Sequence, residues 1–108
     1  MKMVIAIIDS DDSAAVLSEI TRQGLSATKL STSGGFLRAG NVTLLIGVPK
    51  ERLSELLEIL RRFSSKRTQL LPPGGHSFSG EVFPALPVEV TVGGATVFVL
   101  DVEQFYKL

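Results

Sequence analysis

Three long apolar runs constrain the fold of this 108-residue chain more than any other feature. They lie at 3–8 (MVIAII), 42–48 (VTLLIGV) and 95–100 (ATVFVL), and they are apolar on both faces when written as strands. This pattern is typical of strands that are covered on both sides of a sheet. Any fold of the chain must therefore bury both faces of the sheet that these strands form.

The polar run at 9–13 (DSDDS) predicts the start of a helix. Short polar side chains cap the first turn, and carboxylates suit the positive end of the helix dipole. This helix is expected to reach about Gln23, with Leu17 and Ile20 on its inner face and Gly24 at its C-terminal cap. The alternative, a carboxylate site for a divalent cation, lacks further ligands at a suitable spacing.

A second helix is predicted after Pro49, a residue suited to the first helical position. Its apolar side chains recur every three or four residues and form one stripe, which comprises Leu53, Leu56, Leu57, Leu60 and Phe63. Glutamates lie early on its polar face, and basic residues lie late: Arg61, Arg62, Lys66 and Arg67. This order complements the helix dipole and predicts a solvated basic helix end.

The remaining segments predict short strands and loops. A strand is expected at 26–32, and two more at 88–92 and 96–100, joined by a tight turn at Gly93-Gly94. The segment 69–84 contains the run PPGG, so it is predicted to be a flexible loop edged by short strands. The single histidine, His76, lies in this loop without metal-ligand spacing and is expected to be solvated.

The order of these elements predicts an α+β ferredoxin-like fold in one domain, 1–108. It is β-α-β-β-α-β with an extra C-terminal strand, in which two helices cover one face of an antiparallel sheet. Two helices cannot cover the second face, so a symmetric oligomer is predicted to bury it. The residue pattern does not give the number of subunits.

The composition excludes several classes of function. Eleven basic residues balance eleven acidic ones, so the chain has no electrostatic footprint for a DNA or RNA polymer. There is no cysteine for a disulfide, a thiolate nucleophile or a metal site. No run has the length of a membrane span, and the N-terminal apolar run is too short for a signal peptide.

The segment 27–47 contains the candidate ligand site. Glycines at 34, 35 and 40 let a backbone approach a ligand closely, Phe36 offers a ring for stacking, and Asn41 offers both a donor and an acceptor. This combination suits a nucleotide. The spacing alone favours the alternative, a long hairpin loop whose phenylalanine simply packs.

Three blocks of the chain carry a resemblance: MKMVIAI, ATKLSTSGGFLRAGNVTLLIGV and PVEVTVGGATVFVLDVEQF. They closely resemble the PII-like cyclic-di-AMP receptor family, over the whole chain except 64–86. The resemblance implies a cytoplasmic bacterial homotrimer with a PII-like ferredoxin fold. It implies one cyclic di-AMP in each of three inter-subunit clefts, large loops that contact an effector protein, no catalysis, and no cofactor or metal.

The resemblance also implies the ligand-binding residues, which are Thr28, Gly35, Phe36, Leu37, Asn41, Gly47, Gly93, Gly94 and Ala95. The Thr28 hydroxyl donates to the ligand, the segment 35–37 forms a wall around one adenine, and the Asn41 carboxamide pairs with an adenine edge. Gly47 leaves room for the base. The segment 93–95 brings the backbone of a neighbouring subunit against the ligand.

One departure from the family leaves the identity of the ligand undecided. Members commonly carry an arginine directly before the Ala-Thr-Lys-Leu run, and Ser26 stands there in this chain. Loss of a charge-assisted hydrogen bond costs about 1.5–3 kcal/mol, although Arg38 or Lys29 could compensate. The alternatives are a regulator that binds ATP, ADP or AMP, and a ligand-independent oligomeric adaptor. An enzyme has the least support, because only one loop histidine is available as a base.

Overall fold

A computed structural model of the chain describes residues 1–30, 40–71 and 87–108, and for Leu71 it describes the backbone alone. The predictions for the segment 35–37, Arg38 and His76 therefore lie outside the described residues. In chain order the elements are β1 (Lys2–Asp9), α1 (Ser10–Arg22), β2 (Ala27–Leu30), β3 (Asn41–Val48), the 3-10 turn η1 (Lys50–Arg52), α2 (Leu53–Ser64), β4 (Arg67–Leu71), β5 (Val88–Val92) and β6 (Ala95–Asp101).

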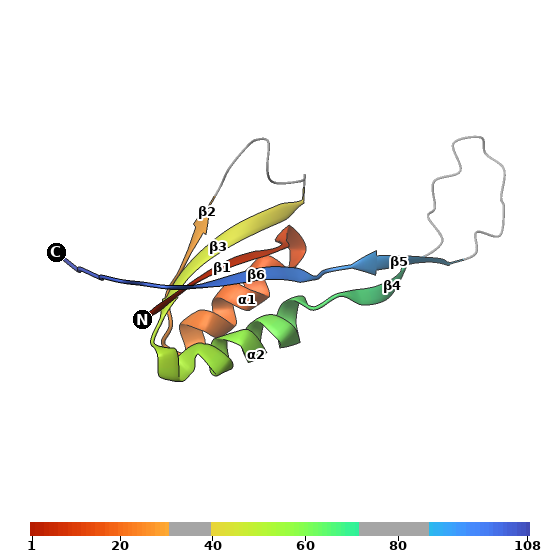
Figure 1. Cartoon of the computed structure of the whole chain (residues 1–108). Helices are drawn as coiled ribbons and strands as arrows, with labels where there is room; N and C mark the ends of the chain where they lie inside the picture. The colour runs from red at the N-terminus through yellow and green to blue at the C-terminus, as the bar shows by residue number, and fades with distance from the viewer. Residues whose placement is uncertain (31–39, 72–86) are drawn as a thin grey trace.

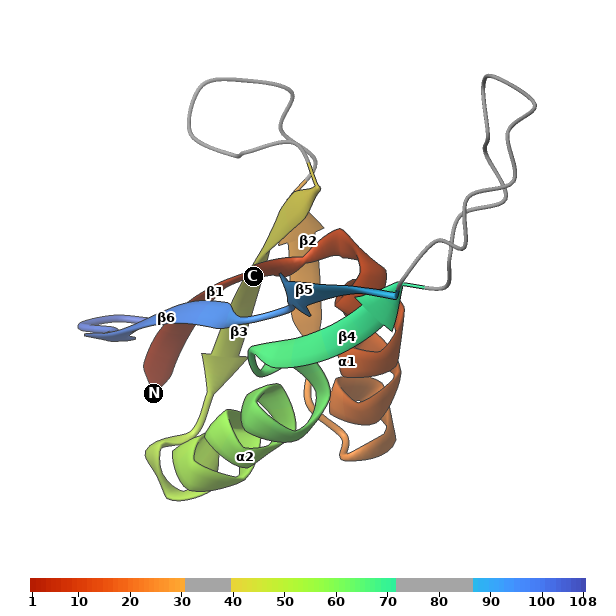
Figure 2. The ribbon, with the colours of Figure 1, turned by 90° about the vertical axis from the view of Figure 1, so that its right-hand side faces the viewer.

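The body of the protein is a four-stranded sheet in the order β2-β3-β1-β6. Every neighbouring pair in it is antiparallel. Both helices lie on the same side of this sheet (Figures 1 and 2). The α+β ferredoxin-like fold predicted from the sequence is thus confirmed. Neither described helix has the length and apolar character needed to cross a membrane.

The polar run after β1 caps α1 as predicted. A side-chain oxygen of Asp9, the N-cap residue, accepts a hydrogen bond from the backbone N–H of Asp11 at 2.9 Å. Asp11 and Asp12 occupy the first turn, where negative charge is favourable. The helix ends at Arg22, and Gly24 follows with a φ of +77°, a conformation that glycine adopts without steric cost.

The core lies between the helices and one face of the sheet, here called the covered face. It presents side chains that are almost fully buried: Val4, Ala6 and Ile8 from β1 and Leu44, Ile46 and Val48 from β3. Val16 and Ile20 of α1 and Leu56 and Leu60 of α2 pack against them. The predicted helical stripe is confirmed for four of its five residues, since Leu53 and Phe63 also pack against this core, whereas Leu57 lines a hollow beside it.

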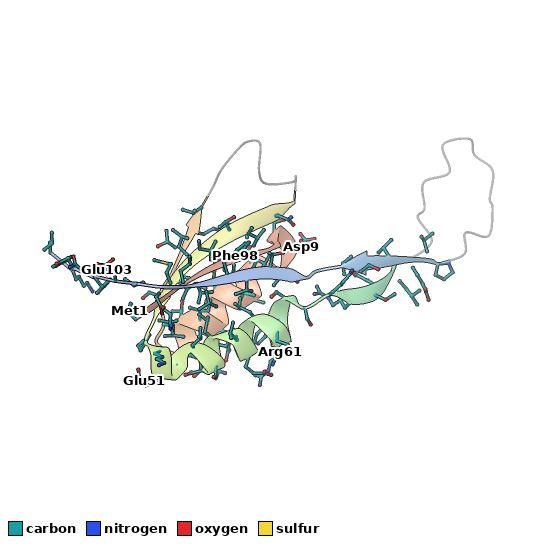
Figure 3. The ribbon with its side chains drawn as sticks, viewed as in Figure 1. Met1, Asp9, Glu51, Arg61, Phe98 and Glu103 are labelled. Atoms are coloured by element: carbon teal, nitrogen blue, oxygen red, sulfur yellow. The ribbon has the colours of Figure 1, made fainter. Side chains whose placement is uncertain are left out.

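The opposite face of the sheet, here called the open face, carries no helix in the described part of the chain. The strand registers place these side chains on it: Thr28, Leu30, Thr43, Leu45, Gly47, Met3, Ile5, Ile7, Thr96, Phe98 and Leu100. Most are apolar, and Phe98 and Leu100 are 52% and 46% exposed; Phe98 is labelled in Figure 3. Burial of the open face by other subunits remains a prediction.

The predicted hairpin of 88–92 with 96–100 is wrong. Strand β5 pairs with β4, from Arg67 opposite Val92 to Leu71 opposite Val88, and β6 pairs with β1. Gly93 and Gly94, with φ of +77° and +105°, carry the chain from one sheet into the other. The reason is that β1 and β5 compete to pair with β6, and β6 pairs with β1 along its entire length. The β4–β5 arm projects from the body (Figure 1), and its two strands edge the predicted loop.

The predicted basic end of the second helix is wrong in part. Helix α2 ends at Ser64, whose hydroxyl donates to the carbonyl of Leu60, and Ser65 is extended with φ −70° and ψ 155°. Lys66 therefore lies beyond the helix, and Arg67 begins β4. Only Arg61 and Arg62 remain on the last turn.

Candidate functional site

Three of the predicted ligand residues lie on strands β2 and β3. Thr28 pairs with Leu45, Gly47 pairs with Met3, and Asn41 pairs with Asp9 at the other end of β3. The alternation of side chains along each strand places all three on the open face. Asn41 and Gly47 are six residues apart, about 20 Å along the strand. Thr28 lies between them, on the neighbouring edge strand.

The surroundings of Asn41 hold it in place. Gly40 precedes it with a φ of +99°, and the Gly40 carbonyl accepts a hydrogen bond from the Ser10 N–H at 2.7 Å. The exit of the segment 31–39 is thereby tied to the start of α1. The Asn41 side chain is exposed, so its carboxamide can accept and donate at the same time.

Gly47 has no structural reason to be glycine. Its φ is not positive, and the nearest atom to an added Cβ is the Met1 sulfur at 3.8 Å, which is an ordinary contact. A side chain would therefore fit into the single chain. The absence of one leaves open space on the exposed end of the sheet, as expected where another molecule approaches the backbone.

The other predicted ligand residues in the described part of the chain are Gly93, Gly94 and Ala95, where β6 begins. The Gly94 N–H donates to the Ser64 carbonyl at 2.7 Å, and Ala95 pairs with Ile8. Strand β6 is the edge of the sheet opposite to β2. Three strand spacings, about 14 Å, separate β6 from Thr28 on β2, and two spacings, about 10 Å, separate it from Asn41 and Gly47 on β3. Ala95 pairs with the buried Ile8, so its side chain also lies on the covered face, opposite to theirs. A single chain therefore does not bring the two groups of residues together.

A hollow of about 430 Å³ opens beside Gly94 and Ala95, between α2 and β6. Apolar side chains form much of its wall, and three polar residues join them: Arg61, Ser65 and Lys66. The sequence pattern predicted Arg61 and Lys66 only as part of a solvated helix end. No motif marks them, and the signal that could have identified them is the end of α2 at Ser64, which turns the chain toward β6.

The carboxylates after β1 do not form a metal site. Asp9 caps α1, and Asp12 forms an ion pair with Arg67 at 2.7 Å. Across residues 1–30, 40–71 and 87–108, no group of three or more histidine, aspartate or glutamate side chains is placed to hold a metal ion. The charged residues of this region serve the helix and the base of the arm.

Comparison with known proteins gives the family. The sequence profile described as "Cyclic-di-AMP receptor" matches residues 1–108, the whole chain. A solved structure described as a functionally unknown protein from Pediococcus pentosaceus ATCC 25745 is similar to this chain, with 41% identity and a TM-score of 0.79. That match covers 99% of this chain and 96% of the other. The chain therefore belongs to the cyclic-di-AMP receptor family.

Proposed function

We propose that this protein is a non-catalytic receptor that binds cyclic di-AMP in clefts between the subunits of a homotrimer. Binding is relayed to an effector protein through the segment 31–39 and the arm that carries 72–86. Membership of the receptor family supports the ligand class. The observation that supports a cleft between subunits is that the candidate ligand residues lie on both sides of β1 in one sheet, on β2 and β3 on one side and at the start of β6 on the other.

The open face supports an assembly of several copies. It carries Ile5, Ile7 and Leu45, and Phe98 and Leu100 are about half exposed. Continuous apolar surface of this kind marks an interface in a small protein. Packing of open faces around a threefold axis covers this surface and sets the edge of each sheet beside the next subunit. The number three comes from the resemblance to PII-like proteins.

The cleft then combines residues from two subunits. One subunit contributes Thr28, Asn41 and Gly47 from its open face, with 35–37 from the adjoining segment. The neighbouring subunit contributes its 93–95 backbone. The Asn41 carboxamide matches the N6 and N7 atoms of an adenine, and the Thr28 hydroxyl offers a further hydrogen bond.

Phosphate groups need positive charge near this cleft, and Ser26 cannot provide it. Lys29 pairs with Leu44, whose side chain is buried under the helices, so Lys29 and Thr28 lie on opposite sides of β2. Arg61 and Lys66 line the hollow beside Gly94 and Ala95. We assign the compensating charge to these two residues, because they adjoin the backbone segment that the neighbouring subunit contributes.

The second candidate function is a receptor for ATP, ADP or AMP on the same architecture. Ser26 favours it, because a missing arginine fork removes a strong partner for phosphate or for a base edge. The glycine-lined site can accept other adenine nucleotides. The two candidates differ only in ligand, so a direct comparison separates them.

The test is calorimetric titration of the purified protein with cyclic di-AMP and, in parallel, with ATP. The proposal predicts saturation by cyclic di-AMP in the clefts and its loss in Asn41→Ala. Gln69→Ala, which removes an exposed carboxamide from the arm, serves as the matched control and should bind normally. Binding of ATP alone would establish the second candidate, and no binding of either would indicate a ligand-independent adaptor.

A further inference from the structure

The base of the arm is a point where three segments of the chain meet. The chain leaves the body at Ser64 and Ser65 and returns through Gly93 and Gly94. The Gly94 N–H donates to the Ser64 carbonyl at 2.7 Å and holds the two passes together. The first turn of α1 is the third segment, and it contributes Asp12.

An ion pair joins the arm to α1 across this junction. The Arg67 guanidinium donates to both carboxylate oxygens of Asp12, at 2.7 and 3.2 Å, and to the Ser65 carbonyl at 3.3 Å. The Asp12 side chain is only 8% exposed, and the pair raises the pKa of Arg67. A two-pronged contact between planar groups fixes orientation as well as distance. A lysine could supply the charge but not this geometry.

Gly93 lies directly against this pair. A Cβ added there would lie 2.6 Å from an Arg67 nitrogen, 2.8 Å from the Ser65 carbonyl oxygen and 3.3 Å from an Asp12 oxygen. Two of these separations are shorter than any ordinary contact. A side chain at residue 93 would therefore displace the Arg67 guanidinium and press on the Ser65 backbone. The guanidinium, in turn, packs against the backbone that leads to Gly94 and Ala95.

We infer that Asp12 and Arg67 are positioning residues, whose ion pair over Gly93 sets both the 93–95 backbone for the ligand and the direction of the β4–β5 arm. This inference rests on the proposed function for its ligand and deepens it. Ligand contact with 93–95 and movement of the arm then depend on one junction. Gly93 packs against the Arg67 guanidinium, and Arg67 is the first residue of β4, so the junction connects the two.

The main variant neutralises both partners together, as Asp12→Asn with Arg67→Gln. This double variant avoids an unpaired charge at a nearly buried position, which would itself disrupt folding. The matched control is Glu19→Gln with Arg22→Gln. It removes a two-pronged ion pair of the same type, also at 2.7 Å, from the far end of α1.

A glycine pair provides an independent test of the packing. Gly93→Ala and Gly24→Ala introduce the same side chain at the same φ of +77°. Nothing lies within 4 Å of the added Cβ at position 24, so that variant carries the backbone strain alone. Any additional effect in Gly93→Ala belongs to the junction.

The first measurement needs no ligand. Because the chain contains no cysteine, spin labels at Glu51→Cys and Glu89→Cys report one distance between body and arm. Labelled chains are diluted with unlabelled ones so that only distances within a chain are recorded. The wild type and both controls should give one narrow distance distribution. The double variant and Gly93→Ala should lose it, and an unchanged narrow distribution in these two would overturn the inference.

The second measurement titrates the same proteins with cyclic di-AMP. The double variant and Gly93→Ala should bind about tenfold more weakly, the scale of one charge-assisted hydrogen bond, while both controls bind normally. Normal affinity in all variants would overturn the inference that the ion pair positions the 93–95 backbone for the ligand. If the wild type itself does not bind, the proposed function fails, and the distance measurement still decides whether Asp12 and Arg67 position the arm.

Discussion

Leu44 and Leu45 are neighbours in β3 with the same side chain, yet they lie on opposite faces of the sheet. Leu44 faces the helices and is fully buried, whereas Leu45 points to the open face and is only partly covered. The same contrast extends along β1, where Val4, Ala6 and Ile8 alternate with Met3, Ile5 and Ile7. One face of the sheet stabilises the single chain. The other is mostly apolar and stays partly exposed in the single chain.

The strongest test of this comparison acts on the covered face. Leu44→Ala should lower the free energy of unfolding by about 2–5 kcal/mol, because it removes a fully buried side chain and leaves a cavity. Urea unfolding followed by circular dichroism measures the change. Leu45→Ala is the matched control. At the lowest protein concentration it should lower the free energy of unfolding by less than Leu44→Ala does. Equal losses would mean that the two faces do not differ as described.

The next test acts on the open face. Leu45→Lys should prevent assembly without unfolding the chain, because a buried charge without a partner is excluded from an apolar interface. Light scattering should give the mass of one chain, with an unchanged far-ultraviolet spectrum. Leu70→Lys places the same change on an exposed residue of the arm and should keep the assembled mass. Assembly of the Leu45→Lys variant would place the interface elsewhere.

A smaller expected effect is a pH dependence of stability that comes from the helix layer and not from the open face. Hydrogen bonds from Arg22 and then Gln23 lower the pKa of Glu19 from its ordinary 4.5 to about 2. A depressed carboxyl pKa stabilises the fold above its unfolded value, and this stability is lost as the pH falls. The free energy of unfolding should therefore decline between pH 4.5 and about 2.

Glu19→Gln should flatten this acid-dependent decline, and Glu89→Gln, on the arm, should not. Both are measured by urea unfolding across the same pH series. The assembled mass at neutral pH should stay constant in both variants, because Glu19 lies on α1 and not on the open face. An identical acid dependence in the wild type and Glu19→Gln would contradict the assignment.

The sequence predicted the elements that local pattern controls. The stripe of Leu53, Leu56 and Leu60 and the cap at Asp9 depend on residues within one or two turns, and both are present. The pattern of 27–47 pointed to Asn41, whereas Thr28 came from a resemblance, which the family match supports at the level of the whole chain. The structure adds that both lie on one side of β1 in the sheet and that 93–95 lies on the other.

The predictions from sequence were wrong where the structure depends on contacts between segments that are distant in the chain. A Gly-Gly pair between two strands suits a tight turn, yet the same positive φ values serve a crossing between two sheets. Which one forms depends on β1, more than 80 residues earlier. The pairing of Arg67 with Asp12 joins residues 55 positions apart. The helical pattern alone placed Arg67 on a solvated face.

The hydrogen bond between Ser64 and Gly94 has a consequence for changes in the arm. It joins the two points at which the arm leaves and re-enters the body, so the body fixes the ends of the insertion independently of its length. The entropy of closing a loop rises only slowly with the number of residues. The arm is therefore an exchangeable module. A change in the arm then leaves the sheet and the candidate ligand residues on β2 and β3 in place.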